Sequence, residues 1–137
     1  MPLLGNDTDG AITRKRLETW ATKVEKVTVV AASDAATTQA QATLAAAGQV
    51  VYTMTPTTGR ALTTPTGAEL GAAFTDEGVG SSFEFSVVNL AASTHAITLT
   101  AGASGVTLVG SATIAAASSA SFVGVFTAAN TVSIYRK

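Results

Sequence analysis

The single histidine of the chain, His95, is the side chain best suited to acid–base or metal chemistry near neutral pH. A metal site needs further ligands, but the chain has no cysteine, no second histidine and no acidic residue near His95 in sequence. His95 instead starts an alternating run and shares a face with Ile97 and Leu99. This setting predicts a hydrogen-bonded or rim histidine, with a pH-sensing contact at an interface as the alternative.

Three short motifs approach known catalytic or ligand-binding patterns and fail at defined positions. Gly102-Ala103-Ser104-Gly105 lacks one position of the Gly-x-Ser-x-Gly nucleophile elbow and lies in a predicted hairpin. Gly78-Val79-Gly80 resembles part of a nucleotide fingerprint but opens a strand instead of a helix. Asp7-Thr8-Asp9-Gly10 has two acids and the glycine of a calcium loop, while Gly5 and Arg16 occupy its first and twelfth ligand positions. We therefore predict a protein that is not an enzyme and has no cofactor and no metal site.

The only basic run is Arg14-Lys15-Arg16. Acidic and basic residues alternate after it up to Lys26, which is typical of a solvated helix face. Contact with an acidic patch on a partner is the alternative interpretation. No aromatic residues interleave with the basic ones and the net charge is −1, so neither nucleic acid nor a membrane is predicted as a partner.

The chain is poor in charge. Only 12% of its 137 residues are charged, against about 25% in ordinary soluble domains. Between Glu84 and Arg136 there is no Asp, Glu, Lys or Arg at all. A weakly charged surface rich in Ser, Thr and Ala is poorly protected against association, so the composition favours a protein that works in an assembly.

The length predicts one domain with, at most, an arm. The N-terminus lacks the basic start and long apolar run of a secretory signal. Polar residues interrupt the alanine-rich stretch over 31–48, which excludes it as a transmembrane helix.

Residues 1–26 form a predicted N-terminal arm or short helix. Leu17, Trp20 and Val24 recur at helical spacing, which predicts an amphipathic helix over 13–25. The glycines and the Asp/Thr cluster before them favour an extended arm equally. Both interpretations remain open on the sequence.

The middle of the chain predicts strands at Val27–Val30 and Val50–Met54, because both runs are β-branched and bounded by breakers. Between them, Ser33 could cap a helix that runs through Ala47 and stops at Gly48.

A second helix start is better defined. Thr66 and Glu69 have the spacing of a capping box, in which each side chain accepts a hydrogen bond from the other residue's backbone N–H. We expect a short helix over 66–74 with Leu70, Ala73 and Phe74 on its buried side.

From Ser81 onwards apolar residues recur at every second position, in short runs about ten residues apart. This pattern predicts an all-β domain over 27–137, an antiparallel β-sandwich or jelly roll. The run Ser121–Thr127 is apolar on both faces, so it is either covered by the helix at 66–74 or lies at a subunit interface. The candidate oligomer interface therefore comprises Phe122, Val123, Val125 and Phe126.

Four segments of the chain carry a family resemblance: Arg60–Leu70 (RALTTPTGAEL), Gly78–Phe85 (GVGSSFEF), Thr100–Gly110 (TAGASGVTLVG) and Ile134-Tyr135-Arg136. Together they resemble the small trimeric capsid decoration (cement) proteins of tailed bacteriophages. The resemblance spans about residues 50–137. It implies a β-sandwich virion protein that sits as a homotrimer on the outer capsid surface, binds the major capsid protein and stabilises the shell.

Residues 1–26 are then predicted to bind the shell, because a lone Trp outside the core is a common interface anchor. The alternative is that Trp20 packs on its own sandwich. The other function considered is a phage tail or surface module that binds a carbohydrate or receptor, which the low aromatic content of 6% disfavours. The candidate capsid contacts are Leu3, Leu4, Arg14, Lys15, Arg16, Leu17 and Trp20.

Overall fold

The computed structural model describes residues 26–75 and 78–137. Of these residues 47% lie in strands and 12% in helices, so the fold is mostly β-sheet, as predicted. The predicted arm or helix over residues 1–26 falls, apart from Lys26, outside the described residues.

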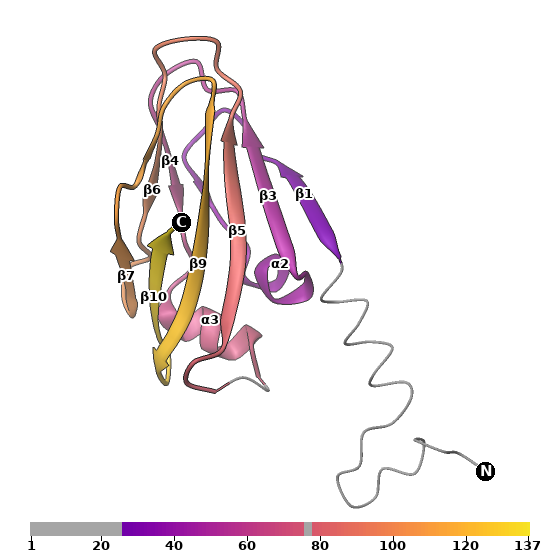
Figure 1. Ribbon diagram of the computed structural model, residues 1–137, viewed down its shortest axis with the longest axis vertical. Coiled ribbons are helices and arrows are strands. Elements are labelled where there is room, and N and C mark those ends of the chain that lie inside the picture. The colour runs from indigo at the N-terminus through magenta and orange to yellow at the C-terminus, as the bar shows by residue number, and fades with distance from the viewer. Residues whose placement is uncertain (1–25, 76–77) are drawn as a thin grey trace, which may run out of the picture.

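The strands form two sheets and are accompanied by two short helices, which lie toward one end of the strands (Figure 1). The larger sheet has the order β1 (Val27–Ala31), β3 (Gln49–Met54), β5 (Ser82–Asn89), β9 (Ser118–Ala128), β10 (Thr131–Arg136) and β7 (Val106–Val109). The smaller has the order β2 (Thr37–Thr38), β4 (Arg60–Thr63), β6 (Ile97–Thr100) and β8 (Thr113–Ile114). The helices are α2 (Gln41–Ala46) and α3 (Gly67–Ala73).

The chain crosses from one sheet to the other at nearly every connection. From β1 to β9 each strand lies in the opposite sheet from the strand before it, and only β9 and β10 follow one another in one sheet. Two parallel neighbours in a sheet have to be joined by a crossover of this kind, whereas a hairpin makes an antiparallel pair. The pairs β1–β3, β3–β5, β2–β4, β4–β6 and β7–β10 are accordingly parallel. The predicted antiparallel arrangement is therefore wrong for most pairs, and only β5–β9, β9–β10 and β6–β8 follow it.

The two strands predicted in the middle of the chain are confirmed within one residue at each end, as β1 and β3. The helix predicted from Ser33 through Ala47 is present only in its second half, as α2, and the predicted start at Ser33 is wrong. The Asp34 carboxylate accepts hydrogen bonds from the Thr57 backbone and hydroxyl and from Arg60, which ties this segment to the β3–β4 turn. The next residues are extended as β2, and the helix begins only at Gln41 without a side-chain cap.

The capping box of α3 is confirmed. The Glu69 backbone N–H donates to the Thr66 hydroxyl at 3.2 Å, and the Thr66 N–H donates to the Glu69 carboxylate at 2.8 Å. The second bond is the main reason that the pKa of the Glu69 carboxyl lies below its ordinary value. Leu70 and Phe74 are buried, as expected, and Ala73 is half-buried.

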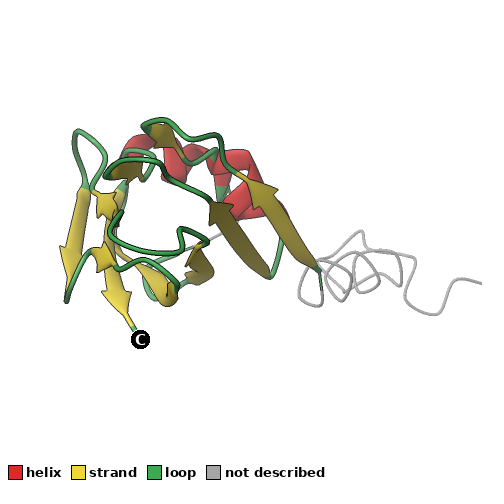
Figure 2. Cartoon of the chain, turned by 90° about the horizontal axis from the view of Figure 1, so that it is seen from above, coloured by secondary structure: helices red, strands yellow, loops and turns green. Residues whose placement is uncertain are grey.

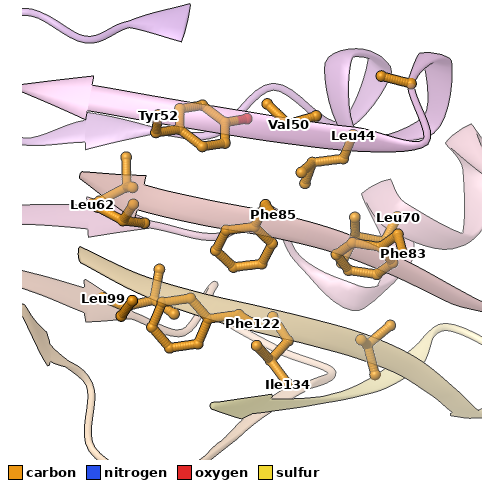
Figure 3. Close-up of a cluster of buried hydrophobic side chains, with 14 of the residues drawn as sticks. Leu44, Val50, Tyr52, Leu62, Leu70, Phe83, Phe85, Leu99, Phe122 and Ile134 are labelled. Atoms are coloured by element: carbon orange, nitrogen blue, oxygen red, sulfur yellow. The ribbon is translucent and has the colours of Figure 1, made fainter. Parts of the chain in front are cut away.

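One hydrophobic core lies between the sheets and the helices (Figures 2 and 3). The alternating pattern in β5, β9 and β10 places one face of each strand in this core. At its centre the Phe85 and Phe122 rings stack at 5.2 Å, and Leu99 of the smaller sheet lies nearby (Figure 3).

Candidate functional site: the outer face of the large sheet

The side of the large sheet that points away from the core has no described helix or strand packed on it. We call it the outer face. Strand alternation assigns to it the residues that lie between the core residues. It consists of Val27, Val29, Ala31, Gln49, Val51, Thr53, Ser82, Glu84, Ser86, Val88, Thr107, Val109, Ser119, Ser121, Val123, Val125, Ser133 and Tyr135.

The strand register aligns these side chains into rows that cross the sheet. Neighbouring strands match residue by residue, so each row meets every strand on the same face. One row spans all six strands, through Val27, Gln49, Glu84, Val123, Tyr135 and Val109. Valines stand at both ends of this row and near its middle.

The outer face carries almost no free charge. Its one charged side chain, Glu84, accepts a hydrogen bond from the Lys137 ammonium at 2.8 Å. The hydroxyls of Ser86 and Ser121 bond to each other at 2.9 Å across β5 and β9. These three polar side chains of the face are thus paired, which lowers the cost of removing them from water.

The four residues of the candidate oligomer interface separate onto two sides of β9. Phe122 and Phe126 are only 2% and 6% exposed and point into the core, where Phe126 packs on Phe74 of the α3 cap at 5.4 Å. The prediction that these two rings lie at an interface is wrong, because α3 and the core cover them, as in the alternative stated for this strand. Val123 and Val125 lie on the outer face, half-buried by their neighbours, and no described element covers that side of β9.

Both edges of the large sheet extend the outer face with exposed valines. Val27 and Val29 of β1 are 56% and 66% exposed, and Val109 of β7 is 45% exposed. The residue pattern of β1 predicts a strand but does not place that strand at an edge. The runs VTVVA and VTLV lack charge, and this is visible in the sequence. Which strands lie at an edge depends on the order of the strands in the sheet, and the residue pattern of a single strand does not give that order.

The segments that carry the family resemblance pack together near α3. The Thr64 hydroxyl accepts a hydrogen bond from the Gly102 backbone, and the Gly67 N–H donates to the Ser104 carbonyl, each at 2.9 Å. The segment Gly78–Phe85 joins β9 through two backbone hydrogen bonds: the Gly80 N–H donates to the Phe126 carbonyl, and the Phe126 N–H donates to the Ser81 carbonyl. These contacts give the shared residues a role in closing the fold.

Asp34 and Arg60 form the only other exposed ion pair found in the described ranges, at 2.6 Å. The hydrogen bond from Arg60, followed by that from Thr57, holds the pKa of the Asp34 carboxyl well below its usual range. Both Asp34 carboxylate oxygens accept hydrogen bonds from Thr57 or Arg60, which lie in the turn between β3 and β4 or at its end. The role of this cluster is to fix the β1–β2 and β3–β4 connections.

His95 lies half-buried in the β5–β6 loop, just before the strand on which it was expected. Its backbone carbonyl accepts a hydrogen bond at 2.8 Å from the buried Asn89 amide, which also binds the Ile114 carbonyl and the Ala91 N–H. The loop is thus held through Asn89 and the His95 backbone.

The described residues show no cluster of catalytic or metal-ligating side chains. No three His, Asp or Glu side chains there gather as a metal site. A shallow groove of about 400 Å³ at the β5–β6 end is lined mainly by alanine, serine and aliphatic side chains. No helix in the described part of the chain is both long and apolar enough to cross a bilayer.

The seven candidate capsid contacts, from Leu3 to Trp20, all lie outside the described residues. Comparison of the chain with protein-family models, curated proteins and solved structures found no match. Functional inference therefore depends on the residues themselves and on the geometry of the outer face.

Proposed function

We propose that this chain is a structural virion protein: a capsid decoration (cement) protein of a tailed bacteriophage that binds the outer capsid surface as a homotrimer and stabilises the shell. The resemblance of residues 50–137 to such proteins motivates the choice of family. The observation that carries the proposal is the uncharged outer face with its valine-bearing edges. A face of this kind suits burial against protein in a lasting assembly.

The size of the outer face is compatible with self-association. Six strands about 4.8 Å apart, each with about five residues rising roughly 3.3 Å, cover an area on the order of 500 Å². A standard interface takes about 800 Å² from each partner. The face and its edges together thus supply an area of the required order.

We also propose that the two sheets form a β-sandwich. Two sheets around one core support a β-sandwich. The parallel pairs produced by the crossovers argue against a jelly roll, which is built from antiparallel Greek keys.

Shell attachment is assigned to residues 1–26. This segment precedes β1, at the edge of the large sheet, and carries Trp20 and the basic run 14–16. Three such segments in one trimer would bind together, so that modest single contacts add up through effective concentration. A protein that binds only the assembled lattice stabilises that lattice by mass action.

The described residues do not favour the alternative of a carbohydrate-binding module. Sugar sites generally present exposed aromatic rings. Of the seven aromatic residues that the structure describes, six are buried, and only Tyr135 is exposed, at 41%.

Two measurements test the proposal. Light scattering of the purified chain at micromolar concentration should give three times the mass of the 13.7 kDa chain. Cosedimentation with shells of the phage that encodes it should remove the chain from solution and raise the temperature at which the shells rupture. A monomer, or a trimer that leaves shells unbound and unchanged, would contradict the proposal.

A further inference from the structure

In the part of the chain that the structure describes, the two edges of the large sheet lack the features that usually protect sheet edges. An edge strand exposes unpaired N–H and C=O groups, and natural proteins protect it with charge, proline, bulges or shortness. Neither β1 (VTVVA) nor β7 (VTLV) contains a charge or a proline, and no bulge interrupts their pairing with β3 and β10.

The smaller sheet provides an internal comparison. Its edge strands, β2 and β8, are only two residues long, which is one of the standard forms of protection. The edges of the large sheet are five and four residues long. The same chain thus keeps one sheet closed to further strands and leaves the other open at both sides.

The two open edge strands, β1 and β7, run in the same direction, and both point valines to the outer face. Following the pairings across the sheet, β1, β3, β5, β10 and β7 all run the same way, and only β9 runs against them. Val29 and Val109 both point to the outer face, while Val30 and Leu108 pack against the core. A strand placed beside β1 with the direction and side-chain pattern of β7 therefore continues the sheet and its apolar pattern.

We infer that β7 of one copy pairs in parallel with β1 of the next copy, so that the homotrimer closes head to tail through its sheet edges. This inference rests on the proposed trimer and specifies how it forms. A self-symmetric pairing of β1 with β1 would instead be antiparallel and stop at a dimer.

The shape of one copy fixes which side faces inward. The core, the smaller sheet and both helices lie on one side of the large sheet. Three copies joined at their edges can close only with this bulk outside, because it does not fit within a ring of three sheets. Closure therefore turns the three outer faces toward the common axis and buries Val123 and Val125.

The side-chain pattern limits the register. A shift by one residue would put outer-face residues opposite core residues, so only even shifts are allowed. Pairing Val109 with Val29 places the exposed valines of the two edges side by side and Thr107 beside Val27.

Cysteine cross-linking tests the pairing directly, since the chain has no native cysteine. The variant with Val29→Cys and Val109→Cys should form a disulfide between copies under mild oxidation, because neighbouring strands place Cα atoms within the bridging range of about 4.4–6.8 Å. On a denaturing, non-reducing gel the expected product is a covalent trimer. Each single variant should remain uncross-linked, as should Thr98→Cys on the exposed side of β6.

Each outcome has a defined meaning. A trimer in solution that yields no cross-linked product from the double variant, either directly or with a short bismaleimide, overturns the edge pairing and leaves the proposed function standing. Dimers from Val29→Cys alone show β1–β1 pairing and also overturn it. A monomer contradicts both proposals.

A charge exchange tests the same contact without oxidation. Val29→Lys should reduce the mass in solution from trimer to monomer, as should Val109→Glu, because each puts an unpaired charge at the contact. The double variant should regain the trimer, since each contact then holds a Lys–Glu pair. Thr98→Lys is the matched control and should stay trimeric. Trimers in both single variants would contradict the inference.

Discussion

The backbone carbonyl oxygen of Asn130, in the β9–β10 turn, occupies the position where a side chain on Gly67 would begin. The Gly105 carbonyl oxygen lies 2.7 Å from the same position. The first turn of α3 thus rests directly on backbone from two other segments. Glycine is required at position 67 because of this close approach.

Replacing Gly67 with Ala should lower the free energy of unfolding by about 1–3 kcal/mol, the usual cost of overfilling a packed site. The added methyl group meets backbone, which cannot rotate aside. Denaturant unfolding measures the loss. Gly59→Ala is the matched control, since the nearest atom to its new methyl lies 4.0 Å away. Equal stability of the two variants would contradict this prediction.

Gly124 leaves room for the Phe83 ring on the adjacent strand. A methyl at position 124 would overlap that ring, which is itself packed against Phe74 and Phe126. Gly124→Ala should therefore cost about 1–3 kcal/mol of unfolding free energy. Combining it with Phe83→Leu should give a loss smaller than the sum of the single losses, because the two changes share one space. Additive losses in denaturant unfolding would show that the contact is not limiting.

Ionisation of Tyr52 should lower the stability of the fold at alkaline pH. Burial raises the pKa of Tyr52 to about 12, from the ordinary value of 10.0 for tyrosine. Because only the neutral form is favoured in the core, the contribution of Tyr52 is fully present below about pH 10 and is lost as the pH rises through about 12. Absorbance of tyrosinate should show a late step in the native protein that is missing from Tyr52→Phe.

The same variant tests the stability at neutral pH. The Tyr52 hydroxyl is buried and has no hydrogen-bond partner among the described residues. Its removal should leave the free energy of unfolding unchanged or raise it by about 1 kcal/mol, since an unpaired buried polar group is destabilising. A clear loss of stability would reveal a partner for this hydroxyl.

His95→Ala should change the free energy of unfolding by less than about 1 kcal/mol. The hydrogen bond that holds this loop uses the His95 carbonyl, which alanine retains. Asn89→Ala is the informative control, because it removes three hydrogen bonds of a side chain that is 1% exposed. We expect its melting temperature to fall well below that of His95→Ala; similar values would mean that the His95 ring matters.

Deleting residues 1–21 should abolish shell binding while the trimer and its melting temperature remain. The core formed by the described residues draws its side chains from positions between Val30 and Ile134. Cosedimentation with shells and light scattering measure the two properties separately. An unfolded deletion variant would show instead that Trp20 packs on its own domain.

Local features of the fold were predictable because their causes are local. Thr66 and Glu69 form the capping box within one turn, and the apolar alternation over residues 83–87 identifies a strand and its buried face. Strand neighbours are different, since they depend on the path between strands. The alternation in β9 could not show that Phe122 faces Phe85 in the same core, nor that Val123 is left on the open side. The helix expected from Ser33 failed for a similar reason, because Asp34 is held by residues more than 20 positions away.

The winding of the chain between two sheets also affects how the protein can be made. The strands β1, β3 and β5 are linked to β10 and β7 only through β9, which spans residues 118–128 of 137. The larger sheet is therefore incomplete until almost the whole chain has left the ribosome. Until then β5 and β10 lack the neighbour that joins the two parts of the sheet, and long-range pairings of this kind form slowly. Completion of this sheet is accordingly expected only after residues 118–136, which form β9 and β10, have been synthesised.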